Sequence, residues 1–355
     1  MKKIVSIVGA RPNFIKLSAL SPFIEKKFNH IIVHTGQHYD FELSEGLFSE
    51  LGLRIPKYNL GIGSASRSMQ ISKILQKGEK VLQKEKPDLV VVYGDTNSTL
   101  AGALAASLLG IPVAHVESGE RCGNPSVPEE LNRTVVDHIS SILFAPTQNA
   151  LTNLRKENLK KAAHFTGDLM IDALASAKLD SARFLRSLSL KKGQYIYATI
   201  HRFENTNGKE QINNILKALN NLEYTVVFPL HPRTAKVLKR YKIHLSVFNN
   251  INFIKPQQYK NSLALISCAH MVISDSGGVL KESYYYKTPC IVLRGEIEEK
   301  TLTATGWVTL LNPKSDLPRL ADVIKNLKVP KNHPDVYGRG HASNAIINRI
   351  QAYLK

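Results

Sequence analysis

Short apolar runs alternate with stretches of helical periodicity along the whole chain, and this alternation limits the fold more than any other feature of the sequence. It predicts α/β units built on parallel sheets. The strands predicted in the first half are Ile4–Val8, His30–His34, Leu89–Tyr93, Pro112–Val116 and Ile142–Ala145. Those in the second half are Tyr195–Ile200, Thr225–Pro229, Ile251–Ile254, Met271–Ser274 and Cys290–Leu293. The predicted helices between them include Thr99–Leu109, Glu129–Ser140, Glu210–Asn220 and Leu280–Tyr286.

A chain of 355 residues is too long for one ordinary core and suits two domains. We expect two Rossmann-like, doubly wound domains that face each other across a cleft. The first domain is predicted over residues 1–166 and the second over 167–340, with the boundary near His164–Leu169. The C-terminal stretch 341–355 carries apolar residues on one helical face, so we expect it to pack back on the first domain.

Composition and charge exclude several classes of protein. Three cysteines without a Cys-x-x-Cys pair indicate reduced thiols in the cytoplasm rather than disulfides or a zinc site. The start of the chain does not resemble a signal peptide, and no stretch is long enough to span a bilayer. The net charge of +18 is spread along the chain, so a small anionic substrate explains it better than nucleic acid or a membrane.

The stretch Met271–Glu282 predicts a buried strand that turns through Ser276, Gly277 and Gly278 into a helix. Free backbone N–H groups at a helix start can bind an anion such as a diphosphate. Glu282, in the first turns of this helix, could then accept hydrogen bonds from ribose hydroxyls. The alternative is a plain strand-to-helix turn in which Glu282 is only a surface acid favoured by the helix dipole.

Polar residues directly follow the predicted strands in both halves. Ligands of open parallel sheets bind at the carboxyl ends of the strands, so this coincidence favours an active site over unrelated surface residues. The residues concerned are Arg11, Asp95, Glu117, His201, His231 and Ser276.

The acids among these positions each have a structural alternative. Asp95 could cap the following helix. Glu117 ends a buried apolar run and therefore needs a partner or a substrate. Glu129 begins a helix, where it could be dipole decoration or pair with Arg133.

Together with His201, the three acids Asp95, Glu117 and Glu129 could supply a general acid and a general base. Arg11 and Lys16 could neutralise a diphosphate leaving group. No metal-ligand spacing is present in the sequence. The residues alone therefore predict a two-domain enzyme that acts on a nucleotide-linked anion by acid–base chemistry.

Several segments, in this order and spacing, resemble the non-hydrolysing branch of the UDP-N-acetylglucosamine 2-epimerase family. They are Gly9-Ala-Arg-Pro-Asn-Phe-Ile-Lys16, Thr35-Gly-Gln-His-Tyr39, Tyr93-Gly-Asp-Thr-Asn-Ser-Thr99, His115-Val-Glu-Ser-Gly119, Pro128-Glu-Glu-Leu-Asn-Arg133, Thr199-Ile-His-Arg202 with Glu204-Asn205, Ser274-Asp-Ser-Gly-Gly278 and Tyr337-Gly-Arg-Gly340.

The resemblance implies a GT-B-type fold and a homodimer that works without a cofactor, in the synthesis of cell-surface polysaccharide precursors. It implies inversion of C2 through anti elimination of UDP to a 2-acetamidoglucal, followed by re-addition. The implied catalytic residues are Asp95, Glu117, Glu129 and His201. The residues implied to bind UDP are Arg11, Lys16, Gln257, Ser276, Gly277, Gly278 and Glu282.

Three departures from the family pattern leave the sugar open. Glu120 adds an acid beside Glu117, Ser262 replaces an aromatic that commonly borders the uracil, and Glu299 stands where many members have an arginine. UDP-2,3-diacetamido-glucuronate is the second candidate substrate, with Lys300 or Arg121 as the possible partner of its carboxylate. The motifs also leave open a hydrolysing 2-epimerase and a GT-B glycosyltransferase.

Overall fold

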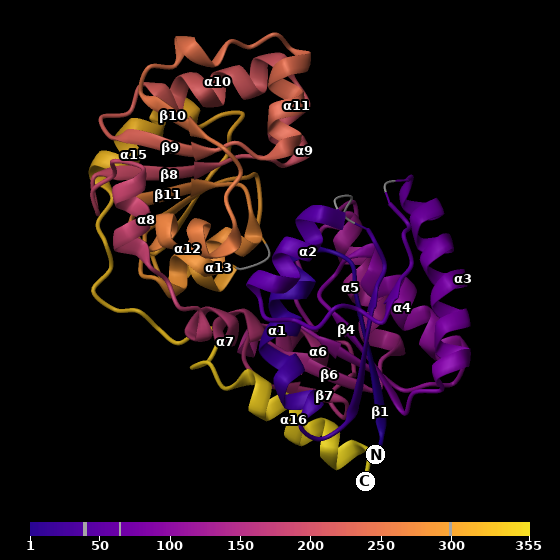
Figure 1. Cartoon of the computed structure of the whole chain (residues 1–355). Coiled ribbons are helices and arrows are strands. Elements are labelled where there is room, and N and C mark those ends of the chain that lie inside the picture. The colour runs from indigo at the N-terminus through magenta and orange to yellow at the C-terminus, as the bar shows by residue number, and fades with distance from the viewer. Residues whose placement is uncertain (38–40, 64, 298–299) are drawn as a thin grey trace. The chain divides into compact units, whose positions relative to one another are not determined.

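The structure is a computed structural model that describes residues 1–37, 41–63, 65–297 and 300–355, without the side chains of residues 41–45 and 300. The chain divides into two compact units. One unit is Met1–Ser176 together with Asp335–Lys355, and the other is Ala177–Pro334. Each is a parallel sheet flanked by helices (Figure 1). The predicted fold class, two doubly wound α/β domains, is confirmed.

The described strands of the first unit form a seven-stranded parallel sheet in the order β3-β2-β1-β4-β5-β6-β7. The direction in which successive strands are added reverses between β1 and β4, which makes the carboxyl ends of these two strands the expected ligand site. The strands are β1 (Lys3–Val8), β2 (Asn29–His34), β3 (Tyr58–Asn59), β4 (Leu89–Tyr93), β5 (Val113–Val116), β6 (Ile142–Ala145) and β7 (Ala163–Phe165).

Helices cover both faces of this sheet, and β1 shows how the sequence divides between them. Ile4 and Val8 point into an apolar cluster with residues of α1 and α16, whereas Val5 and Ile7 join a cluster with residues of α3 and α4. A strand buried on both faces needs apolar residues at nearly every position. The helices are α1 (Arg11–Glu25), α2 (Phe41–Glu50), α3 (Arg67–Glu85), α4 (Asn97–Leu108), α5 (Pro128–Ile139), α6 (Gln148–Lys156), α7 (Leu169–Ser176) and α16 (Ala342–Tyr353).

The boundaries of the first unit differ from the predicted ones. The sequence predicts a first domain over 1–166 plus 341–355 and a second over 167–340, whereas the first unit continues to Ser176 and resumes at Asp335. The reason is that α7 packs against α1 and α16. The C-terminal helix α16, yellow in Figure 1, lies beside α1 and α7 and buries Ile346, Ile347 and Ile350 there.

The described strands of the second unit form a six-stranded parallel sheet in the order β10-β9-β8-β11-β12-β13, with its reversal between β8 and β11. The strands are β8 (Tyr195–Thr199), β9 (Thr225–Pro229), β10 (Ile251–Ile254), β11 (Met271–Ser274), β12 (Cys290–Leu293) and β13 (Val308–Leu311). The helices are α8 (Ser181–Ser187), α9 (Phe203–Thr206), α10 (Lys209–Asn220), α11 (Pro232–Arg240), α12 (Tyr259–Cys268), α13 (Gly277–Tyr285), α14 (Lys300–Ala304) and α15 (Leu320–Asn326), with 3-10 turns at Leu245–Val247 and Leu317–Arg319. Within the described ranges, no helix is both long and apolar enough to cross a membrane.

Candidate active site

Three of the predicted site residues lie at the carboxyl edge of the first sheet. Arg11, Asp95 and Glu117 follow β1, β4 and β5, which are consecutive in the sheet, and the reversal point lies between β1 and β4. Arg11 is exposed. The prediction that residues far apart in sequence meet at one sheet edge therefore holds for this unit.

Glu117 is held by a buried cation. The Lys16 ammonium forms an ion pair with the Glu117 carboxylate, and the two side chains are only 5% and 16% exposed. Glu117 has φ 67°, in the left-handed region, which costs a non-glycine residue roughly 1–3 kcal/mol. Its backbone N–H donates to the Phe144 carbonyl at 3.1 Å. A Cβ at Gly94 would lie 3.0 Å from Glu117 Oε2, so the glycine leaves room for this pair.

Asp95 is paired with an arginine and does not cap the next helix. The cap of α4 is Thr96, whose hydroxyl accepts a hydrogen bond from the Thr99 N–H at 3.3 Å. The Asp95 carboxylate forms an ion pair with Arg133 Nη2 instead. The capping alternative for Asp95 is therefore wrong, and this carboxylate is turned toward groups of α5.

At the start of α5, Arg133 pairs with Glu130. Its Nη1 lies 3.3 Å from Glu130 Oε2, whereas Glu129, for which pairing with Arg133 was one of two alternatives, is exposed. Glu130 turns inward and accepts the backbone N–H groups of Cys122 (3.0 Å) and Gly123 (2.9 Å). Burial opposes ionisation of Glu130, but these donors and Arg133 hold its pKa below the usual range.

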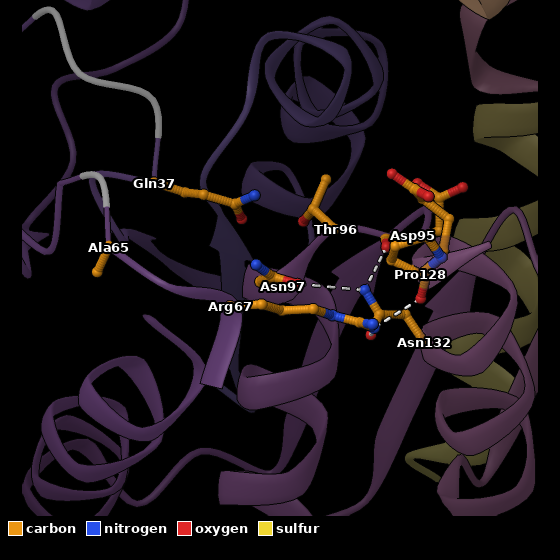
Figure 2. A pocket seen from close by; sticks show the side chains of 9 residues that line it. Gln37, Ala65, Arg67, Asp95, Thr96, Asn97, Pro128 and Asn132 are labelled. Carbon is orange, nitrogen blue, oxygen red and sulfur yellow. Dashed lines mark hydrogen bonds between the residues drawn. The ribbon is translucent and has the colours of Figure 1, made fainter. Parts of the chain in front are cut away.

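A pocket of about 300 Å³ brings Asp95 and Glu129 together. Figure 2 shows Arg67 reaching Asn132 on its wall, where Arg67 Nη2 donates to Asn132 Oδ1 and to the Pro128 carbonyl, both at 2.6 Å. Asn132 Nδ2 in turn donates to the Asp95 carbonyl at 2.7 Å. The lining residues are Gln37, Ala65, Arg67, Asp95, Thr96, Asn97, Pro128, Glu129 and Asn132.

Most of the polar lining is not predicted from the sequence. Gln37 lies in one of the family motifs, and its Oε1 accepts hydrogen bonds from the N–H (2.9 Å) and hydroxyl (2.6 Å) of Ser98. Arg67 begins α3, and nothing in its sequence neighbourhood marks it. Its place becomes evident only once α3 packs against α4.

The second unit places His201 and His231 after the neighbouring strands β8 and β9, with ring centroids 4.8 Å apart in a stacked arrangement. A fully buried carboxylate, Asp275, fixes the turn after β8. It accepts the backbone N–H groups of His201 (3.0 Å) and Arg202 (2.9 Å) and the Asn205 amide (3.0 Å). Asp275 lies in one of the family motifs, but the sequence alone assigns it no role.

The predicted UDP turn follows β11, next to β8 at the reversal point of this sheet. Helix α13 begins at Gly277, with Ser276 as its N-cap and Gly278 in its first turn. Glu282 is buried at 6% exposure on the same helix. Gln257 follows β10 and is half-buried; its Nε2 donates to the Lys255 carbonyl at 2.7 Å.

The positions that depart from the family pattern are partly described. Glu120 is buried and accepts a hydrogen bond from the Thr147 hydroxyl at 3.2 Å. Arg121 is bonded to Asp137 (2.7 Å) and Glu157 (2.8 Å). Ser262 is buried in α12. Glu299, the Lys300 side chain, and His38 and Tyr39 of the second motif lie outside the described residues.

The fold and these side chains define a class: a two-unit, doubly wound α/β enzyme with its candidate residues at the carboxyl edges of both sheets. The family model described as UDP-N-acetylglucosamine 2-epimerase matches residues 24–351. The chain therefore belongs to the UDP-N-acetylglucosamine 2-epimerase family, and the predicted family is confirmed.

Individual relatives match the chain from end to end. A UDP-N-acetylglucosamine 2-epimerase homolog of Methanococcus maripaludis is 43% identical, covering 98% of this chain and 99% of the relative. UDP-2,3-diacetamido-2,3-dideoxy-D-glucuronate 2-epimerase of Pseudomonas aeruginosa is 40% identical, covering 99% of each. The crystal structure of Methanocaldococcus jannaschii UDP-GlcNAc 2-epimerase in complex with UDP-GlcNAc and UDP superposes with a TM-score of 0.91 at 38% identity, covering 99% of each chain.

Proposed function

We propose that this protein is a non-hydrolysing epimerase that interconverts UDP-N-acetylglucosamine and UDP-N-acetylmannosamine for the synthesis of cell-surface polysaccharide precursors. The observation that carries the proposal is the grouping of carboxylates at one sheet edge of a family member: Asp95 and Glu129 line one pocket, and Glu117 follows the adjacent strand β5. A homodimer stays a prediction.

The reaction requires groups that move a proton at C2. In anti elimination, a base takes the C2 proton, the C1–O bond breaks, and UDP leaves with that electron pair to give the 2-acetamidoglucal. Re-addition of UDP to C1, with a proton delivered to the opposite face of C2, completes the inversion. Two proton-carrying groups on opposite faces of the sugar are therefore needed.

Asp95, Glu117 and Glu129 are the proposed catalytic acids, with His201 near the sugar or the leaving group. Their environments differ, since Asp95 and Glu117 are each ion-paired whereas Glu129 is exposed. Different environments are what allow similar carboxylates to take different roles in one reaction.

The second unit is proposed to bind most of the UDP portion, and the first unit is proposed to contribute Arg11 and Lys16. The start of α13 offers backbone N–H groups for the diphosphate, and Glu282 offers acceptors for the ribose hydroxyls. The full set of proposed UDP-binding residues is Arg11, Lys16, Gln257, Ser276, Gly277, Gly278 and Glu282. No added cofactor takes part in this mechanism.

Incubation of the purified chain with UDP-N-acetylglucosamine in D₂O, followed by proton NMR, tests the proposal. We expect loss of the C2 proton signal and growth of UDP-N-acetylmannosamine. Release of free N-acetylmannosamine with UDP would identify a hydrolysing enzyme instead. Sugar transfer to an acceptor without exchange at C2 would identify a glycosyltransferase.

The diacetamido uronate is the second candidate substrate, because a 2-epimerase for that sugar is 40% identical over 99% of this chain. A uronate carboxylate needs a cation to offset its desolvation. Arg121 is already bonded to two carboxylates, whereas Arg67 lines the pocket with Asp95 and Glu129. A kcat/KM preference for the uronate above about tenfold, equivalent to ~1.4 kcal/mol, would overturn the first choice of substrate.

A further inference from the structure

A fully buried histidine links the two turns that carry Asp95 and Glu117. His115 lies on β5, two residues before Glu117, and is 0% exposed. Its Nε2 lies 2.7 Å from the carbonyl oxygen of Gly94, the residue before Asp95. Its Nδ1 lies 2.6 Å from Asp137 Oδ1 on α5. One ring thus joins the turn after β4, the end of β5 and the helix that begins near Glu129.

Asp137 extends this link to the loop after Glu117. The carboxylate is also 0% exposed, and its Oδ2 accepts the Gly119 N–H at 3.0 Å and Arg121 Nη2 at 2.7 Å. Arg121 continues to the Glu157 carboxylate through Nε and Nη2, each at 2.8 Å. A histidine, an arginine and two carboxylates are therefore gathered behind the turns, and a buried carboxylate with several donors favours its ionised form.

The hydrogen bonds determine where the ring protons lie. The Gly94 carbonyl can only accept, so Nε2 of His115 carries a hydrogen. Asp137 already accepts the Gly119 N–H and Arg121 Nη2 at Oδ2, and these two donors favour its ionised form. An ionised Asp137 can only accept at Oδ1, so Nδ1 of His115 carries a hydrogen as well.

We propose that His115 and Asp137 form a buried imidazolium–carboxylate pair that positions the turns bearing Asp95 and Glu117. Both are positioning residues, because both are fully buried and neither lines the pocket. The His115 ring sets the distance between the two acid-bearing turns, and Asp137 holds the loop that follows Glu117. The catalytic part of this inference rests on the proposed epimerase function, whereas the protonation of the ring does not.

The first test measures the protonation of the two ring nitrogens of His115. A nitrogen-15 spectrum of the histidine-labelled full chain at neutral pH should show His115 with hydrogens on both ring nitrogens, its signals assigned by their loss in His115→Gln. One unprotonated nitrogen in this ring would overturn the proposal. This measurement needs no substrate, so it decides the inference even if the wild-type chain shows no exchange at C2, the result that would refute the proposed function.

The second test separates positioning from general stability. Asp137→Asn should lower kcat by about 10²-fold, the loss expected from a misplacement of about 1 Å, while UDP affinity changes less than about twofold. The matched control is Asp172→Asn: Asp172 also accepts two backbone N–H groups, from Ala342 (3.1 Å) and Ser343 (2.7 Å), but these start α16, away from the pocket. Each variant is assayed at a temperature at which circular dichroism shows it folded.

The control should be less stable yet keep kcat within about twofold of wild type, because it touches neither turn. A folded Asp137→Asn variant that also keeps kcat within about twofold would show that the pair only stabilises the unit, and the proposal would fail. His115→Asn keeps a donor near the Nδ1 position and His115→Gln keeps one near Nε2. Because positioning needs both bonds, each of these variants should lose kcat.

Discussion

Replacement of Lys16 by methionine should destabilise the first unit through its partner, Glu117. Both side chains are largely buried, at 5% and 16% exposure. Removing one member of a buried ion pair costs about 3–5 kcal/mol, because the remaining charge stays largely buried and loses its counter-ion. Glu117 retains some exposure and can recover part of its hydration, so we expect the lower end, about 3 kcal/mol.

The double variant Lys16→Met/Glu117→Gln measures the coupling free energy between the two side chains directly. Glu117→Gln keeps the size and backbone of the residue, so the strain of its left-handed conformation is retained in every arm of the cycle. In the double variant Lys16→Met/Glu117→Gln, both charges of the pair are absent. The losses of unfolding free energy in the two single variants should therefore not add. We expect a coupling free energy of about 2 kcal/mol, well above the 0.2–1 kcal/mol typical of exposed pairs.

A tryptophan in the second unit serves as a spectroscopic reference, and a lysine–aspartate pair serves as the control. Its single tryptophan, Trp307, lies in the second unit, so fluorescence in urea follows that unit and should not move in any variant. Far-UV circular dichroism and hydrogen exchange along α1 follow the first unit. The control cycle uses the exposed pair Lys2 and Asp88, 3.0 Å apart. A Lys16–Glu117 coupling no larger than that of this control would refute the argument that burial makes the pair strong.

Three further outcomes are expected. Glu282→Ala should weaken UDP binding by roughly 1.5–3 kcal/mol, the range for a hydrogen bond to a charged group, and unchanged affinity in calorimetry would count against the site. Amide substitutions at Asp95, Glu117 and Glu129 should each cut turnover by about 10²–10⁴-fold with UDP affinity retained, and near-normal turnover in all three would remove their catalytic assignment. Burial lowers the pKa of His30 from 6.5 to about 4, although Glu25 opposes the shift. As the pH falls, His30 is therefore protonated in the unfolded chain before it is protonated in the folded one. Its contribution to the free energy of unfolding is fully present above pH 6.5 and is lost as the pH falls toward 4. The loss should approach about 3 kcal/mol for this largely buried ring, and His30→Gln should remove that part of the pH dependence of the urea midpoint; an unchanged dependence would contradict it.

The strands that the sequence predicts and those that it misses differ in their place in the sheet. Leu89–Tyr93 and Met271–Ser274 match β4 and β11 residue for residue, because interior parallel strands are buried on both faces and read as continuous apolar runs. The described strands that are not predicted, β3, β7 and β13, are three of the four edge strands, whereas the fourth, β10, matches the predicted Ile251–Ile254. An edge strand has neighbours on one side only, so its apolar pattern is often weaker and harder to separate from the loops.

The residues of the candidate site also differ in whether the sequence predicts them. Residues that follow strands are predictable, because parallel geometry alone brings the carboxyl ends of strands to one edge. Arg67 and Asp137 sit on helices, and only the packing between α3, α4 and α5 brings Arg67 to the pocket and Asp137 behind the turns that carry the acids. The choice of Glu130 over Glu129 as the partner of Arg133 depends on which side of α5 turns inward. Local spacing allowed both partners, and only burial distinguishes them.

In both units, buried side chains accept hydrogen bonds from the backbone N–H groups of the loops that carry the candidate site residues. A loop that leaves a parallel strand has backbone N–H groups without a strand partner. Where such an N–H group is buried, it needs another hydrogen-bond acceptor. Asn13 supplies it for Gly9 and Ala10 after β1, at 3.2 and 3.1 Å. Asp137 does so for Gly119 after β5, and Asp275 for the turn after β8. The three acceptors are at most 1% exposed. A buried side chain with several hydrogen bonds has little freedom to move, so each acceptor fixes a loop next to a proposed site residue: Arg11, Glu117 or His201. The polar residues that sequence reasoning finds are therefore mainly those presented by the loops, and the ones it misses are mainly those that hold the loops in place.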